Sequence, residues 1–83
     1  MVDRTSDESE LTRRDVGRYL EALGAEFQAD TDSIDVTVGN KEIRLSPPET
    51  LTLSVNVVER TSRLRADRET VEIELRWKRD RDR

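Results

Sequence analysis

Residues 70–77 read Thr70-Val71-Glu72-Ile73-Glu74-Leu75-Arg76-Trp77, and the stretch ends on the only tryptophan of the chain. Apolar and polar residues alternate through it without a break. A period of two places the four apolar residues on one face of a β-strand and the four polar residues on the other face. The stretch therefore predicts a strand that hides one face and exposes the other to water.

Two shorter alternating segments lie earlier in the chain, over residues 33–38 and 41–45, and Gly39-Asn40 separates them. A two-residue connection that begins with glycine is typical of a tight β-hairpin, because such turns need a positive φ. This turn places Val36 opposite Ile43 and Ile34 opposite Leu45, with Val38 on the same inward face. The turn and the apolar pattern thus predict the same register.

Pro47-Pro48 ends the second of these strands, because proline cannot donate to a strand ladder. The alternation resumes over residues 50–58, with Leu51, Leu53, Val55 and Val57 inward. A seven-residue loop, Thr61 to Asp67, then leads to the final strand. This loop length predicts four apolar pairs on one face: Val57 with Val71, Val55 with Ile73, Leu53 with Leu75, and Leu51 with Trp77.

A helix is predicted upstream of the strands, with Thr12 as its N-cap and Asp15 at the third helical position. Apolar residues at helical spacing form one stripe along it: Val16, Tyr19, Leu20, Leu23 and Phe27. Gly17 and Gly24 each weaken the helix by about 1 kcal/mol relative to alanine. Close approach of the helix to the sheet would explain either glycine.

The expected fold is α+β: one N-terminal helix packed on a four-stranded antiparallel meander, which makes a two-layer sandwich. Residues 1–10 are expected to be a disordered tail, residues 11–78 the folded domain, and residues 79–83 a charged C-terminal tail. The sheet face away from the helix would be polar and carry Asp35, Thr37, Glu42, Arg44, Thr52, Ser54, Asn56, Glu72, Glu74 and Arg76.

The composition suggests a thin core and an unusual environment. Of 83 residues, 33% are hydrophobic and 41% are charged, and acidic residues outnumber basic ones by 19 to 15. Lys41 and Lys78 are the only lysines. An acidic surface poor in lysine suits a salt-rich cytoplasm, where self-repulsion is screened; the alternative is an ordinary acidic protein with skewed codon usage. The acidic balance argues against general binding to nucleic acid or anionic membranes, and no apolar run reaches the length of a membrane span.

The assembled pattern resembles the amphi-Trp domain, a small family named for an amphipathic final strand that ends in tryptophan. The matching segments span roughly residues 11 to 78: Thr12-Arg13-Arg14 leading into Val16, Tyr19-Leu20 and Leu23; Ile34 to Val38 with Gly39; Pro47-Pro48-Glu49; Leu51 to Val57; and Val71 to Trp77. Many members are short proteins of salt-loving archaea. The resemblance implies no catalytic or binding residues. This chain differs from the usual acidic ending, because Lys-Arg-Asp-Arg-Asp-Arg follows Trp77.

Catalytic chemistry is not expected, and neither is a cofactor or a metal. The chain contains no histidine and no cysteine, which removes the usual general base and any thiolate nucleophile. Glu72 and Glu74 share a strand face that is expected to be solvated. Asp30, Asp32 and Asp35 have spacing faintly like a calcium loop, but the glycine at the sixth position and the glutamate at the twelfth are absent.

Four arginines gather around the loop before the final strand: Arg60, Arg63, Arg65 and Arg68. Clustered arginines can bind phosphate or nucleic acid. Here Glu59, Asp67 and Glu69 interleave with them, which favours local ion pairs and a solvated loop. Anion or nucleic-acid binding is therefore the alternative hypothesis.

Trp77 has two interpretations: it caps the apolar layer near Leu51, or it anchors an interface with a second subunit. The final strand lies at a sheet edge, and unpaired edges invite pairing with another chain. The leading hypothesis is a non-enzymatic interaction module that forms a homodimer through an edge strand or the polar face, with Trp77, Glu72, Glu74 and Arg76 as candidate interface residues.

Overall fold

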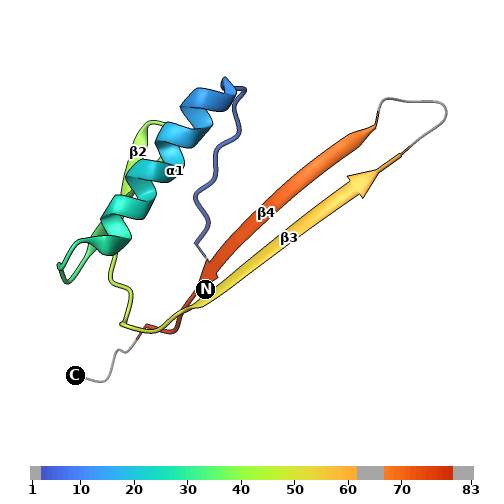
Figure 1. Cartoon of the computed structure of the whole chain (residues 1–83). Helices are drawn as coiled ribbons and strands as arrows, with labels where there is room; N and C mark the ends of the chain where they lie inside the picture. The colour runs from blue at the N-terminus through green and yellow to red at the C-terminus, as the bar shows by residue number, and fades with distance from the viewer. Residues whose placement is uncertain (1–2, 62–66, 80–83) are drawn as a thin grey trace. The chain divides into compact units, whose positions relative to one another are not determined.

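The computed structural model describes residues 3–61 and 67–79 and shows one helix followed by four strands (Figure 1). Their bounds are α1 Arg13–Gln28, β1 Ile34–Val38, β2 Lys41–Leu45, β3 Thr52–Arg60 and β4 Arg68–Arg76. Both strand pairs are antiparallel, which confirms the predicted α+β class. The chain divides into two compact units, Met1–Ser46 and Pro47–Arg83.

Helix α1 begins as the sequence predicts. The Thr12 hydroxyl oxygen accepts a hydrogen bond from the backbone N–H of Asp15 at 3.1 Å, and Thr12 itself has extended backbone angles. This is the N-cap geometry that satisfies one of the unpaired donors of the first turn. Asp15 also places a negative charge near the positive end of the helix dipole.

The two helix glycines do not mark a close approach to the first hairpin, because a Cβ atom built on Gly17 or Gly24 would meet nothing within 4 Å. Gly39 is different, because its φ is +61° and the turn requires this left-handed backbone. A positive φ at the first turn residue and none at Asn40 is the pattern of a type II′ hairpin turn.

The hairpin β1–β2 has the predicted register, with Val36 opposite Ile43 and Ile34 opposite Leu45. Helix α1 lies against this hairpin and contacts β1 (Figure 1). Ile34 is the one buried hydrophobic side chain among the described residues, at 3% exposure. The core of the first unit is therefore centred on the start of β1.

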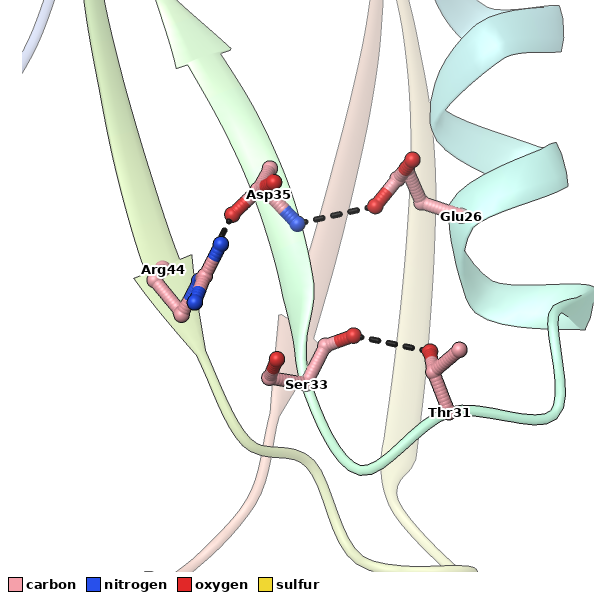
Figure 2. A network of polar contacts seen from close by, with 5 residues as sticks. All are labelled: Glu26, Thr31, Ser33, Asp35 and Arg44. Carbon is pink, nitrogen blue, oxygen red and sulfur yellow. Dashed lines mark hydrogen bonds and ion pairs between the residues drawn. The ribbon is translucent and has the colours of Figure 1, made fainter.

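Two side chains of α1 reach the outer edge of β1. Tyr19 donates its hydroxyl hydrogen to the carbonyl of Thr37 at 2.7 Å. Glu26 accepts a hydrogen bond from the backbone N–H of Asp35 at 2.8 Å (Figure 2). With a two-residue turn, the backbone groups of residues 35 and 37 point away from β2. The helix thus satisfies polar groups that an edge strand would otherwise offer to another chain.

Two further polar contacts lie in the same region, one in the link between α1 and β1 and one between Asp35 and β2. The hydroxyl of Thr31 donates to the carbonyl of Ser33 at 2.8 Å, and the Nε–H of Arg44 donates to the Asp35 carboxylate at 3.1 Å (Figure 2). The hydrogen bond and the charge of Asp35 raise the pKa of Arg44 above its usual value. The ion pair is exposed to water, so its stabilising effect is small.

The hairpin β3–β4 is longer, with nine residues in each strand. Val57 pairs with Val71, Val55 with Ile73, and Leu53 with Leu75, as the seven-residue loop predicts. The ladder ends at Thr52–Arg76, so the predicted pair of Leu51 with Trp77 lies one step beyond it. The strands extend closer to the loop than the pattern indicated, because β3 continues to Arg60 and β4 begins at Arg68.

The sheet differs from the predicted four-stranded meander. The described strands form two sheets of two strands, β1–β2 and β3–β4, and no ladder joins β2 to β3 among them. Pro47 and Pro48 lie in the link between these strands, where they remove two backbone donors and favour an extended chain. The helix followed by four antiparallel strands is confirmed, and the described strands form two sheets of two strands each.

Candidate functional site: the apolar face of the second hairpin

The alternating pattern of β3 and β4 produces one apolar face. Antiparallel partners lie on the same side of a hairpin, so the paired residues gather there rather than on opposite sides. We call this surface the apolar face; its members are Leu53, Val55, Val57, Val71 and Ile73. These side chains are between 52% and 66% exposed. Contiguous exposed apolar patches often mark sites of interaction with a partner.

No other described element of the second unit covers this face. Each of the five side chains keeps more than half of its surface in water. At one end of the face the apolar residues are less exposed, because Leu51, Leu75 and Trp77 are half-buried. The alternation predicted correctly which side chains share a face, but it carried no information on what covers that face.

Trp77 follows the last residue of β4 and lies beside Leu51. Both residues line a shallow depression of about 470 Å³, whose other walls are Thr50, Thr52, Arg76 and Lys78. The proximity of Trp77 to Leu51 agrees with the first interpretation of the indole, as a cap on the apolar layer. The depression is formed within the second unit alone, and Trp77 is half-buried there.

The opposite face of the hairpin is polar and holds the other candidate interface residues. Glu72, Glu74 and Arg76 are all exposed on β4, and they alternate with the apolar side chains as predicted. An Nη1–H of Arg76 donates to the Glu74 carboxylate at 3.1 Å. This ion pair partly neutralises the face and leaves Glu72 as the acidic group nearer the loop.

The loop end of the hairpin carries a like-charge pair on each face. Arg60 lies directly opposite Arg68 on the polar face, and Glu59 lies directly opposite Glu69 on the apolar face. Directly opposed like charges destabilise an antiparallel pair. Arg60 and Arg68 are thus brought together as the anion hypothesis requires, whereas Arg63 and Arg65 lie outside the described residues.

The Glu59–Glu69 pair was not singled out from the sequence, although the signal was present. A seven-residue loop already fixes Glu59 opposite Glu69, one step closer to the loop than Val57 opposite Val71. The apolar alternation ends at Val57 and Val71, so the apolar pattern alone does not include this pair. A carboxylate pair therefore terminates the apolar face at its loop end, and Trp77 terminates it at the other end.

The described residues were examined for clusters of potential metal ligands. No group of three or more histidine, cysteine, aspartate or glutamate side chains that could hold a metal is found in residues 3–61 and 67–79. Asp35, part of the faint calcium-like spacing, is engaged by Arg44 instead. No helix in the described part of the chain is long and apolar enough to cross a membrane.

A depression of about 490 Å³ also lies in the first unit, where the N-terminal segment runs beside the turn of β1–β2. Its walls are Asp7, Glu8, Ser9, Leu11, Tyr19, Thr37, Val38 and Gly39. It is open to solvent and combines two carboxylates with apolar and backbone surface.

Comparison with known proteins agrees with the pattern of elements. Neither a curated protein nor a solved structure matches the chain. The family model of the amphi-Trp domain matches residues 2–83, which includes the helix, both hairpins and the terminal tryptophan. This chain therefore belongs to the amphi-Trp domain family.

Proposed function

We propose that this protein is a non-enzymatic interaction module that associates with itself as a homodimer in a salt-rich cytoplasm. One observation carries the proposal: the five side chains of the apolar face are more than half exposed, on a hairpin with no buried residue among those described. Burial of apolar surface is the main favourable term in protein association. A second copy would supply that burial without any other component.

The proposed contact differs from the edge strand and the polar face considered from the sequence alone. The polar face of β4 carries an internal ion pair between Arg76 and Glu74, whereas the apolar face exposes side chains whose burial would be favourable. Tyr19 and Glu26 of the helix occupy the edge of β1, so that edge is less available for strand addition, whereas the edge considered from the sequence is that of the final strand, β4. These observations favour the apolar face as the contact.

The size of the face sets the expected affinity. Nine residues at about 3.4 Å each and two strands about 4.8 Å apart give a flat footprint of roughly 300 Å² per copy. Standard interfaces bury about 800 Å² per partner, so the dimer should be weak, in the micromolar to millimolar range. A salt-rich solvent strengthens apolar association and screens the repulsion between two acidic chains.

The test is a mass measurement by light scattering and sedimentation equilibrium, from micromolar to millimolar protein in concentrated salt. The variant Val55→Asp places a charge in the centre of the apolar face, and we expect it to remain monomeric because burial of an unpaired charge is costly. The matched control is Asn56→Asp, which adds the same charge one residue away on the polar face and should leave the dimer intact.

Two outcomes would contradict a dimer formed through the apolar face. The first is a wild-type mass of one subunit over the whole concentration range. The second is equal dimerisation by Val55→Asp and wild type, which would place the contact on the edge or the polar face. The fluorescence of Trp77 reports whether the second hairpin of the variant keeps its structure, since it is the only tryptophan.

A second function, anion binding by the loop end, is supported by the register. Arg60 and Arg68 face each other directly, and they line a depression of about 270 Å³ with Val58, Thr70 and Glu72. Two guanidinium groups on one face can hold a phosphate by paired hydrogen bonds. Glu72 in the same depression opposes this charge.

This second function predicts retention of inorganic phosphate or single-stranded RNA whose affinity falls steeply with added salt. The double variant Arg60→Gln, Arg68→Gln should abolish retention, whereas Arg44→Gln in the first unit should not. Absence of binding by the wild-type protein at low salt would rule the function out.

A further inference from the structure

We propose that the N-terminal segment, residues 3–11, is a strap that closes over the turn of the first hairpin, with Gly39 as its seat. The segment has no helix or strand of its own before the N-cap Thr12. Every residue of the proposed contact belongs to the unit Met1–Ser46, so the inference is independent of self-association. It gives a structural role to residues that the sequence alone predicts as a disordered tail.

The strap and the hairpin form two sides of one depression of about 490 Å³. The strap contributes Asp7, Glu8, Ser9 and Leu11, and the other side is formed by Tyr19, Thr37, Val38 and Gly39. A segment without regular structure loses conformational entropy for every residue that it orders. A closed strap therefore needs contacts that offset this loss, and the structure shows one at each end of the depression.

The closest contact joins the side chain of Asp7 to Gly39. A Cβ atom built on Gly39 would lie 3.0 Å from the Oδ1 atom of Asp7, 3.1 Å from its Cγ and 3.4 Å from its Cβ. A Cβ atom built on Gly17 or Gly24 meets nothing within 4 Å. A methyl group at position 39 would require the Asp7 side chain to shift, whereas the hydrogen of glycine leaves room for it.

Gly39 thus has two roles that can be separated. The first is the φ of +61° that the hairpin turn requires, and it depends on the hairpin alone. The second is the space that receives Asp7, and it depends on the strap. A substitution at residue 7 changes the second role and leaves the first as it is.

Leu11 is the second point at which the strap is held. It directly precedes the N-cap of α1 and shares the walls of the depression with Tyr19 and Val38. Leu11 is 55% exposed, so almost half of its surface is removed from water. Burial of this apolar surface favours the closed strap.

The strap closes over the outer edge of β1. The Tyr19 hydroxyl donates to the Thr37 carbonyl at 2.7 Å, and both residues line the depression beside the strap. The backbone groups of an edge strand can pair with another chain when they are accessible. A closed strap restricts access to Thr37, and a released strap opens it.

The direct test is nuclear Overhauser spectroscopy of the full chain. One Hα atom of Gly39 points where a Cβ atom would lie, so a cross-peak between it and the Hβ atoms of Asp7 is expected. Cross-peaks between Thr37 and Glu42, which are opposite each other in the ladder, show that the hairpin is formed. A formed hairpin without the Asp7–Gly39 cross-peak would overturn the proposal.

A double-mutant cycle measures the same contact as an energy. Gly39→Ala in the wild type strains the turn and displaces Asp7, whereas in Asp7→Ala it strains the turn and meets only a Cβ atom at ordinary contact distance. The unfolding equilibrium constant, followed by helix circular dichroism, should therefore increase by a factor that is at least about two times larger in the wild type.

Asp3→Ala is the matched control for this cycle, because it removes a carboxylate from the same segment outside the depression. Gly39→Ala should cost as much in the Asp3→Ala background as in the wild type. An equal cost in all three backgrounds would show that Asp7 does not rest on Gly39, and would overturn the proposed seat.

Amide exchange tests whether the strap covers the edge of β1. The N–H of Thr37 points away from β2, so its exchange reports access of water to this edge. It should be several-fold faster in Asp7→Ala than in the wild type, whereas the N–H of Val36, which faces Ile43 in the ladder, should change little. Unchanged exchange at Thr37 would overturn the covering role of the strap.

Discussion

The two hairpins of this chain have the same alternating pattern but different surroundings. The strands of β1–β2 are five residues long, join through a two-residue turn and pack beside a helix, and Ile34 is almost fully buried. The strands of β3–β4 are nine residues long and expose most of their apolar side chains. The difference shows that alternation specifies the faces of a strand, whereas burial depends on a separate element that covers one face.

The edges of the two hairpins differ as well. The outer edge of β1 is bonded to Tyr19 and Glu26, which belong to the helix of the same unit. The described residues of the unit that contains β3 and β4, 47–61 and 67–79, include no comparable helix. The first hairpin is therefore stabilised within its own unit, whereas the second has surface left to contribute to an interface.

The comparison would be tested most strongly by the same substitution in both hairpins. Ile34→Ala should destabilise the first unit by about 2–5 kcal/mol, because it leaves a cavity at a buried position. Ile73→Ala removes a side chain that is 52% exposed, so its cost should be roughly 1 kcal/mol in dilute protein. Urea denaturation followed by helix circular dichroism and by Trp77 fluorescence reports the two units separately. Equal losses for the two variants would mean that both faces are equally covered in solution.

A smaller loss is expected when the helix loses its N-cap. Thr12→Ala removes the oxygen that accepts from the Asp15 N–H, which should cost about 1 kcal/mol. Thr12→Ser retains an equivalent oxygen and should keep most of the stability. The change should appear in the circular dichroism signal of the helix. Equal stability of Thr12→Ala and wild type would show that the cap contributes nothing.

The hydrogen bond from the helix to the edge of β1 should contribute less to stability than the N-cap does. Tyr19→Phe removes only the hydroxyl that donates to the Thr37 carbonyl, and its expected cost is about 0.5–1 kcal/mol, since the tyrosine is 41% exposed. Amide exchange near Thr37 should accelerate in the variant. Unchanged stability and exchange would show that water replaces the hydroxyl without loss.

The smallest expected effect is a gain. Gly17→Ala should stabilise the helix by about 0.5 kcal/mol, because a Cβ atom at this position has open space and alanine restricts the unfolded chain. Gly39→Ala is the matched control and should destabilise the first hairpin, because its φ of +61° is strained for alanine. Destabilisation by Gly17→Ala would reveal a close neighbour of the helix in solution.

The sequence predicted the local features well because local chemistry determines them. Thr12 was identified as the N-cap, Gly39 as the first turn residue, and the loop length gave the register that places Val55 opposite Ile73. Each of these features depends on residues that are close along the chain or fixed by one turn. The geometry of a cap, a turn or a hairpin register therefore depends little on the rest of the fold.

The continuity of the sheet and the covering of the second hairpin could not be predicted in the same way. Whether β2 pairs with β3 depends on the path of the chain through Pro47 and Pro48, and on the competition between one sheet and two. The exposure of Leu53 and Val57 depends on which apolar surface reaches them first, within the chain or from another copy. Neither question has a signature in the alternation of β3 and β4.

The opposed like charges at the loop end have a consequence for how the second hairpin responds to its solvent. Arg60 repels Arg68 on one side of the ladder, and Glu59 repels Glu69 on the other. Dissolved ions weaken both repulsions, since the screening distance falls from about 10 Å at 0.1 M to about 3 Å at 1 M. The strand ends beside the loop should therefore fray in dilute buffer and stay paired in concentrated salt. The ionic strength of the medium thus contributes to the stability of this hairpin.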